Sequence, residues 1–257
     1  MNRHSASALL LTAAALAFSL SGEETKKPAV ALAPPSSTIP SPKPAQRAPT
    51  PEQKWVNSVY QDLLGRPADP AGLTQWSSML ARGTSRRDVA AVILGTAECR
   101  STFVQGLYKS LLGRPADPAG LNAFTSLLAQ GGTYRQVNSM ILSSPEYFKA
   151  KSRGGNAGFV DALYKDVLGR PADPAGRSAF VSQLDKGTPR VQVVNAFISS
   201  PEALSALARK LYNQFLHRNP DPNGLQFFTS AFGQGQREEN AIATILSSPE
   251  YFQRATK

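Results

Sequence analysis

The heptapeptide Arg-Pro-Ala-Asp-Pro-Ala-Gly decides how this chain folds, because it occurs three times without change. The copies are Arg66–Gly72, Arg114–Gly120 and Arg170–Gly176, and a fourth, altered copy is Arg218–Gly224, with the sequence Arg-Asn-Pro-Asp-Pro-Asn-Gly. Motifs that recur at a fixed period are typical of repeat proteins, in which each copy contributes one supersecondary unit. The sequence therefore predicts four related units.

The spacing of the copies shows where the units differ. Their arginines are separated by 48, 56 and 48 residues. A glutamate follows each arginine after 32 residues in all four copies, at Glu98, Glu146, Glu202 and Glu250. The extra eight residues therefore lie between copies two and three, and we place them at 151–158, a segment that contains Gly154 and Gly155. We expect internally fixed units and a looser middle joint.

Each unit has the pattern of helices with marked ends. In copy two, Val104, Leu107, Tyr108 and Leu111 recur at the spacing of one helix face, and Gly113 follows as a C-terminal stop. The Asp-Pro step in each motif favours a new helix, with aspartate as N-cap and proline in the first turn. No sustained alternation of apolar and polar residues predicts a strand.

We interpret the recurring acidic residues and glycines of the units as structural, through helix capping and close turns. They are Asp69, Asp117, Asp173 and Asp221, Gly72, Gly120, Gly176 and Gly224, and Glu98, Glu146, Glu202 and Glu250. The predicted fold is all-α, with four tandem helical repeats of about 48 residues after a disordered proline-rich segment. An extended solenoid and a pair of compact halves both fit this pattern.

Six segments follow from this interpretation. Residues 1–21 have a basic start, an apolar stretch and small residues, so we expect a signal peptide cleaved after Ser21; an uncleaved anchor is the alternative. Residues 22–51 form a proline-rich disordered linker. The four repeats then occupy residues 52–98, 99–150, 151–203 and 204–257.

The composition argues against most catalytic chemistry. The chain has 257 residues, a formal net charge of +10, one cysteine and two histidines. A single cysteine forms no disulfide within the chain, and Cys99 stands at an aromatic position of the repeat, as expected of a buried filler. A pair of acidic residues that acts in acid–base catalysis needs to be buried, and the sequence around Glu238 and Glu239 does not indicate burial. We expect no enzyme activity, no cofactor and no metal site.

Two sets of charged residues allow functional alternatives. The aspartate loops resemble calcium ligands, although each offers one carboxylate where calcium takes six to eight oxygens. A second basic set lies near the start of the third helix of each unit, where the helix dipole disfavours cations, and so indicates a polyanion-binding surface. A solvated face is the more usual explanation of such a set of charges. The members of this second basic set are Arg86, Arg87, Arg135, Arg190 and Arg237. For the arginine that opens each motif, one interpretation is a row of anion-binding groups. The structural interpretation, which the 32-residue interval favours, is pairing with a helix-end carbonyl or with the glutamate of its own unit.

The string Leu-Tyr-x-x-Leu-Leu-Gly-Arg-Pro-Ala-Asp-Pro-Ala-Gly-Leu at 107–121, with Ser-Ser-Pro-Glu-Tyr-Phe at 143–148, resembles the bacterial domain-of-unknown-function 4214 family. The resemblance covers residues 55–252 in four copies. That family resembles the helical linker domains of phycobilisome rods and recurs in secreted and surface-layer proteins. The resemblance implies an assembly or adhesion role outside the cytoplasm and carries no activity or functional residue with it.

Together these observations predict an exported, non-enzymatic interaction module with a structural, adhesive or assembly role. Its partner is expected to be a protein or a cell-surface polysaccharide. The chain itself is expected to be periplasmic, at the cell surface or secreted. A nucleic-acid partner is not expected, nor is a membrane span after signal removal. The alternatives are a binder of acidic glycans or lipid head groups, and a calcium-responsive surface module.

Overall fold

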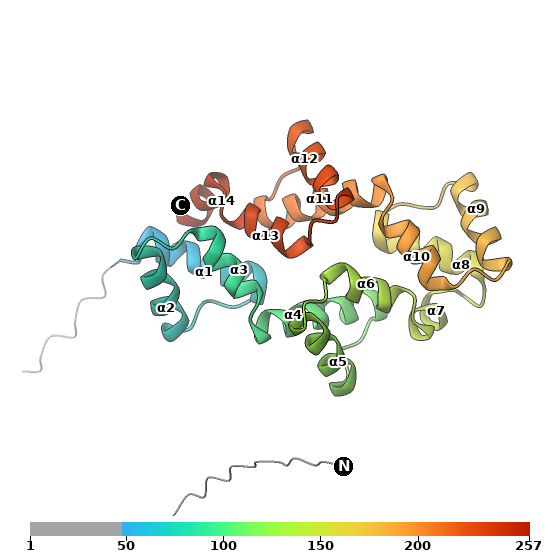
Figure 1. Ribbon diagram of the computed structural model, residues 1–257, viewed down its shortest axis with the longest axis horizontal. Coiled ribbons are helices and arrows are strands. Elements are labelled where there is room, and N and C mark those ends of the chain that lie inside the picture. Colours follow the sequence, from blue (N-terminus) through green and yellow to red (C-terminus); the bar gives the residue numbers. More distant parts are fainter. Residues whose placement is uncertain (1–47) are drawn as a thin grey trace, which may run out of the picture. The chain divides into compact units, whose positions relative to one another are not determined.

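The computed structural model describes residues 48–257, in which every regular element is a helix (Figure 1). The predicted signal peptide and most of the predicted linker lie outside the described residues. The linker was expected to run through Pro51, but Pro51 is the first residue of a helix, because Thr50 caps it by accepting a hydrogen bond from the Gln53 backbone N–H at 3.3 Å. Within residues 48–257, no helix is long and apolar enough to cross a membrane.

Each of the four repeats supplies an entry helix, an outer helix and an inner helix. The entry helices are α1 (Pro51–Leu64), α4 (Ala97–Leu107) with η1 (Tyr108–Leu112), α8 (Asn156–Leu163) with η2 (Tyr164–Leu168), and α11 (Pro201–Leu216). The outer helices are α2 (Pro70–Ala81), α5 (Pro118–Ala129), α9 (Pro174–Asp185) and α12 (Pro222–Gly233). The inner helices are α3 (Arg86–Leu94), α6 (Tyr134–Leu142), α10 (Arg190–Ile198) and α13 (Glu238–Leu246).

The joints between repeats differ as the spacing predicts. At the first joint, α4 continues with η1 from the end of repeat one into repeat two. At the third joint, α11 does the same between repeats three and four. The predicted boundaries 98/99 and 203/204 therefore fall within helices. At the middle joint, α7 (Pro145–Lys151) ends and α8 begins after a short turn in which Gly154 has φ +92°. The last helix, α14 (Pro249–Thr256), is the counterpart of α7 and ends the chain.

The first and fourth repeats pack against each other, so these helices form neither an open solenoid nor two separate halves (Figure 1). The buried Trp55 of α1 donates its indole N–H to the Leu246 carbonyl of α13 at 2.9 Å. The Tyr251 hydroxyl of α14 donates to Asp62 of α1 at 2.7 Å, and Arg254 pairs with the same carboxylate at 2.6 Å. The two ends of the described chain are thus joined by hydrogen bonds and by packing.

The first and second halves of the body use equivalent contacts, at positions 104 residues apart, the interval from Arg66 to Arg170. Tyr147 donates to Asp166 across the joint of repeats two and three, as Tyr251 donates to Asp62 across the joint of repeats four and one. Tyr147 and Tyr251 are both fully buried. One contiguous core runs through all four repeats, and burying each large side chain in it contributes about 1.5–3 kcal/mol.

Candidate functional sites

The repeated heptapeptide forms one compact polar cluster in each repeat. In repeat two, Arg114 makes two parallel hydrogen bonds to Glu146, from Nε to Oε1 at 2.5 Å and from Nη2 to Oε2 at 2.7 Å. Its Nη1 reaches Asp117 Oδ2 at 3.3 Å and the Pro115 carbonyl at 2.9 Å. The guanidinium also lies over the Tyr108 ring, 5.1 Å from its centroid. The arginine therefore joins the entry helix, the outer helix and the next joint.

The other three repeats build the same cluster around Arg66, Arg170 and Arg218. Their arginines pair through Nε with Glu98, Glu202 and Glu250 at 2.6, 2.5 and 2.5 Å. Each motif aspartate also caps its outer helix, since Asp69, Asp117, Asp173 and Asp221 accept the backbone N–H of Gly72, Gly120, Gly176 and Gly224 at 2.8–2.9 Å. That backbone hydrogen bond is the main reason why the pKa of each aspartate is lowered.

The geometry of these clusters leaves the motif aspartate few oxygens for a cation. In repeat two, Oδ1 of Asp117 accepts from Gly120 and Oδ2 faces Arg114. Within residues 48–257, no group of three or more histidine, cysteine, aspartate or glutamate side chains is arranged to hold a metal ion. The four aspartates also lie in separate repeats, each at the start of its own outer helix.

Four of the five arginines of the second basic set contact a neighbouring repeat. Arg86 lies over the Phe252 ring with 4.1 Å to its centroid, and Arg190 lies over Phe148 with 4.4 Å, at equivalent joints of the two halves. Arg237 donates to the Gly131 and Gly132 carbonyls at 3.0 and 2.9 Å.

The remaining two members differ from each other. Arg135 lies 5.9 Å from the Phe232 ring centroid and forms an ion pair with Glu238 at 3.9 Å. Arg87 is exposed on α3. The five arginines thus divide between contacts that join repeats and one solvent-exposed side chain, a division that the sequence pattern does not distinguish.

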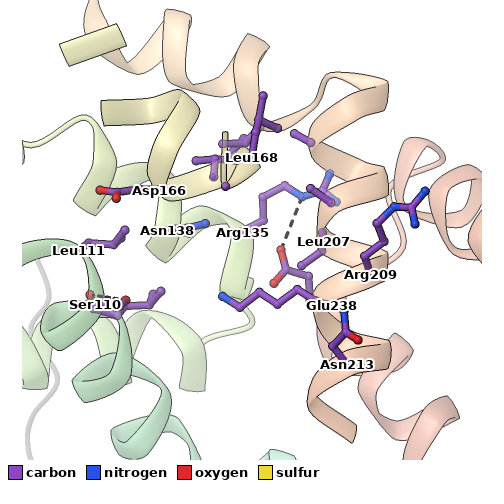
Figure 2. Close-up of a pocket in the computed structure, with 17 residues that line it drawn as sticks. Ser110, Leu111, Arg135, Asn138, Asp166, Leu168, Leu207, Arg209, Asn213 and Glu238 are labelled. Atoms are coloured by element: carbon purple, nitrogen blue, oxygen red, sulfur yellow. Dashed lines mark hydrogen bonds and ion pairs between the residues drawn. The ribbon is translucent and has the colours of Figure 1, made fainter. Parts of the chain in front are cut away.

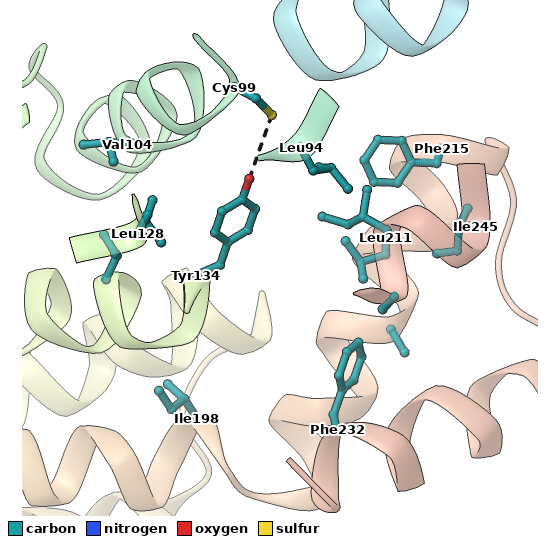
Figure 3. Packing of buried hydrophobic residues seen from close by; sticks show 14 of the residues in the cluster. Leu94, Cys99, Val104, Leu128, Tyr134, Ile198, Leu211, Phe215, Phe232 and Ile245 are labelled. Atoms are coloured by element: carbon teal, nitrogen blue, oxygen red, sulfur yellow. Dashed lines mark hydrogen bonds between the residues drawn. The ribbon is translucent and has the colours of Figure 1, made fainter. Parts of the chain in front are cut away.

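Cys99 is buried, 3.9 Å from the hydroxyl of Tyr134 (Figure 3). Burial raises the pKa of its thiol to about 11, so the thiol form dominates near neutral pH. His217 takes the left-handed conformation, φ 54°, where the other entry helices end in glycine.

A cavity of about 480 Å³, which opens to solvent and which the sequence pattern does not reveal, is lined by residues of repeats two, three and four (Figure 2). Arg135 of α6 and Glu238 of α13 lie side by side in its wall as an ion pair of 3.9 Å, and Asp166 of η2 and Arg209 of α11 also line it (Figure 2). The Glu238 side chain is only 15% exposed. Burial raises its pKa to about 7, against the opposing effects of Arg135 and Lys210. The signal for this burial was present, since Glu238 occupies the position at which repeat two has Tyr134.

The fold and these clusters define an all-helical protein of four packed repeats. In each repeat the same Arg–Glu pair joins the end of the entry helix to the helix that follows the inner helix. The family model described as domain of unknown function (DUF4214) matches residues 36–101, 94–151, 138–207 and 204–255. The chain therefore belongs to the DUF4214 family, as the resemblance of its motifs predicts. No curated protein and no solved structure gives a significant match to this chain.

Proposed function

We propose that this protein is an exported, non-enzymatic module that interacts with a protein or polysaccharide of the cell envelope or extracellular matrix, in a structural, adhesive or assembly role. The proposal of export rests on the basic start, apolar stretch and small residues of segment 1–21 and on the proline-rich segment after it. The proposal of interaction rests on the folded body.

The observation that carries the interaction role is the repeated outer helix. Each of α2, α5, α9 and α12 buries only one or two residues, and α5 and α9 each bury a single leucine, Leu128 and Leu184. Other apolar residues of these helices, such as Phe124 and Phe180, pack partly against the core, and the exposed face that remains is available to a partner. The Arg–Glu–Asp cluster fixes the start of each outer helix. Four copies of one rigid helix suit a partner that itself repeats, because several weak contacts then combine into strong binding.

The fourth outer helix also has an apolar contact point. Phe227 of α12 is 58% exposed, whereas the other outer helices have Gln75, Ala123 and Ala179 at the equivalent position. Exposed aromatic side chains supply much of the binding energy at protein interfaces.

The two alternative functions have less support. A polyanion surface needs free cations, and Arg86, Arg190 and Arg237 are engaged with neighbouring repeats. A calcium-responsive module needs free carboxylate oxygens, and the motif aspartates use theirs on a backbone N–H and an arginine.

Export is tested by expressing the full chain with its own N-terminus in a bacterial host and separating the cytoplasmic and extracytoplasmic fractions. We expect a mature protein that begins at Gly22, measured by mass spectrometry of the intact chain. A chain that retains residues 1–21 and stays in the cytoplasm would contradict the proposal.

The interaction is tested by site-specific photo-crosslinking in the extracytoplasmic fraction. In a Cys99→Ala background, a single cysteine at Ala123 or Ala179 carries the crosslinker, and a cysteine at Gln136 of α6 is the matched control. We expect the same crosslinked product from both outer-helix positions and not from Gln136. A product that forms equally from all three positions would argue against the outer helices as the contact surface.

A further inference from the structure

The two halves of the body differ in the surroundings of Glu238. Because equivalent contacts recur 104 residues apart, each residue around the cavity has a counterpart in the other half. Six lining residues are smaller or more polar than their counterparts. Given with the counterpart in parentheses, they are Leu207 (Phe103), Glu238 (Tyr134), Ala203 (Cys99), Ala206 (Thr102), Leu111 (Phe215) and Asn138 (Ile242).

The counterpart region is filled by packed side chains. Phe103 and Tyr134 stack with their ring centroids 3.6 Å apart, and Tyr134 reaches Cys99 (Figure 3). Phe215 and Ile242 are 1% and 6% exposed. A separate hollow of about 290 Å³ lies beside Tyr134, and its lining coincides with the counterparts of the cavity only at Leu94, Tyr134 and Glu239. The two stacked rings and Phe215 thus occupy the space that corresponds to the cavity.

The cavity has cations at three positions where the other half has none. Arg135, Arg209 and Lys210 line the cavity, and their counterparts are Glu239, Gln105 and Gly106; the reverse holds at Asn213, whose counterpart is Lys109. Arg209 and Lys210 are exposed residues of α11, and Arg135 reaches in from α6 (Figure 2). Apolar side chains supply the rest of the wall: Leu107, Leu111, Val167, Leu168, Ile198 and Leu207.

We propose that this cavity is a binding site for a small amphipathic organic anion, whose apolar body lies against the leucines and whose negatively charged head group is held by Arg135, Arg209 and Lys210. The volume falls in the range of small-molecule sites, which combine apolar walls with a few convergent polar groups. The inference is independent of the proposed interaction role, because none of the outer-helix surface is used.

The acidic groups around the cavity set its pH dependence. Asp166 of η2 accepts from Tyr147 and pairs with Lys151, so its charge is balanced within the chain. Glu239 of α13 is paired with Arg237. Glu238 pairs with Arg135 at 3.9 Å, and because its pKa is about 7 it becomes neutral in mild acid and leaves the Arg135 charge to the head group. Anion binding should therefore be tighter at pH 6 than at pH 8.

The test uses two fluorescent probes with the same aromatic body, the anionic anilinonaphthalene sulfonate and the neutral N-phenylnaphthylamine, added to the full chain. We expect one sulfonate probe per chain, displaced by octanoate, and weaker binding of the neutral probe. The double variant Leu207→Phe with Glu238→Tyr copies the filled half, and should lose the probe while keeping its helical circular dichroism.

A second variant separates charge from folding. Arg209→Gln with Lys210→Gln alters two exposed side chains, and should weaken sulfonate binding by about 3- to 10-fold, as expected for exposed charges, with no change for the neutral probe. Equal binding of the two probes, or undiminished sulfonate binding by a folded Leu207→Phe, Glu238→Tyr chain, would overturn the proposal. Glu238→Gln should retain binding and lose its dependence on pH.

Discussion

The hydroxyl of Tyr108 lies so close to Gly120 that a Cβ placed on this glycine would be 2.2 Å from the tyrosine oxygen. The same approach occurs in the other repeats, where the corresponding distances are 2.7, 2.0 and 2.4 Å for Gly72, Gly176 and Gly224. The last residue of each heptapeptide is therefore glycine because the end of the entry helix packs directly on the first turn of the outer helix.

Gly120→Ala should lower the free energy of unfolding by about 1–3 kcal/mol, the usual cost of overpacking a filled site. Urea unfolding followed by circular dichroism measures the change. Gly106→Ala is the matched control, because Gly106 is also helical and an added Cβ there meets no atom within 4 Å. That control should be neutral or stabilising by up to about 1 kcal/mol. Equal losses for the two variants would exclude the close approach as the cause.

Trp55→Phe should destabilise the body by about 1–3 kcal/mol, because the buried Leu246 carbonyl loses its donor. Trp76→Phe is the comparison, since the other repeats already have phenylalanine at that position and Trp76 donates to a side-chain hydroxyl, that of Tyr60. Thermal unfolding of the two variants measures the difference. A smaller loss for Trp55→Phe than for Trp76→Phe would mean that the contact between repeats one and four contributes little.

Acid should weaken the Arg–Glu pairs. The hydrogen bond from Arg114 holds the pKa of Glu146 below its usual value, so the unfolded chain binds more protons than the folded chain in that range. The stabilisation is complete above the ordinary glutamate pKa and is lost as the pH falls through the folded value. Urea midpoints at pH 6 and pH 3.5 should differ less for Glu146→Gln than for the unaltered chain. Asp185→Asn, which removes an exposed carboxylate bonded to an amide, should leave the difference unchanged.

Glu238 should have the opposite dependence. Its folded pKa of about 7 lies above the ordinary value of 4.5, so the folded chain binds the proton more tightly. Its contribution to stability is complete below pH 4.5 and is lost as the pH rises through 7, by up to about 3 kcal/mol. Glu238→Gln should therefore raise the melting temperature at pH 8 and change it little at pH 4.5. An equal effect at both values would show that Glu238 does not titrate in this interval.

The elements of the fold could be predicted because their signals are local. Asp117 and Pro118 define the start of α5 by themselves, and Gly113 defines the end of η1, since caps act within one turn. The constant interval of 32 residues also favoured a structural pairing of Arg114 with Glu146, and the two side chains form a hydrogen bond. These features occur in all four repeats, so each repeat could be checked against the other three.

The closure of the body and its cavity could not be predicted in this way. The contact of Trp55 with Leu246 joins residues 191 apart in sequence, and neither residue recurs in all repeats. The cavity is lined from three repeats, and Glu238 looks like one more helix-start carboxylate until its surroundings are known. An alignment of the two halves shows that Glu238 stands at the position of Tyr134, but it does not show that a cavity lies beside Glu238.

The contact between the first and last repeats also limits how such chains can change in length. An open array grows or shrinks by one unit at no topological cost, whereas a fifth unit inserted here would separate Asp62 from Tyr251 and leave both faces bare. The contact between the two ends therefore ties the number of units in this body to four.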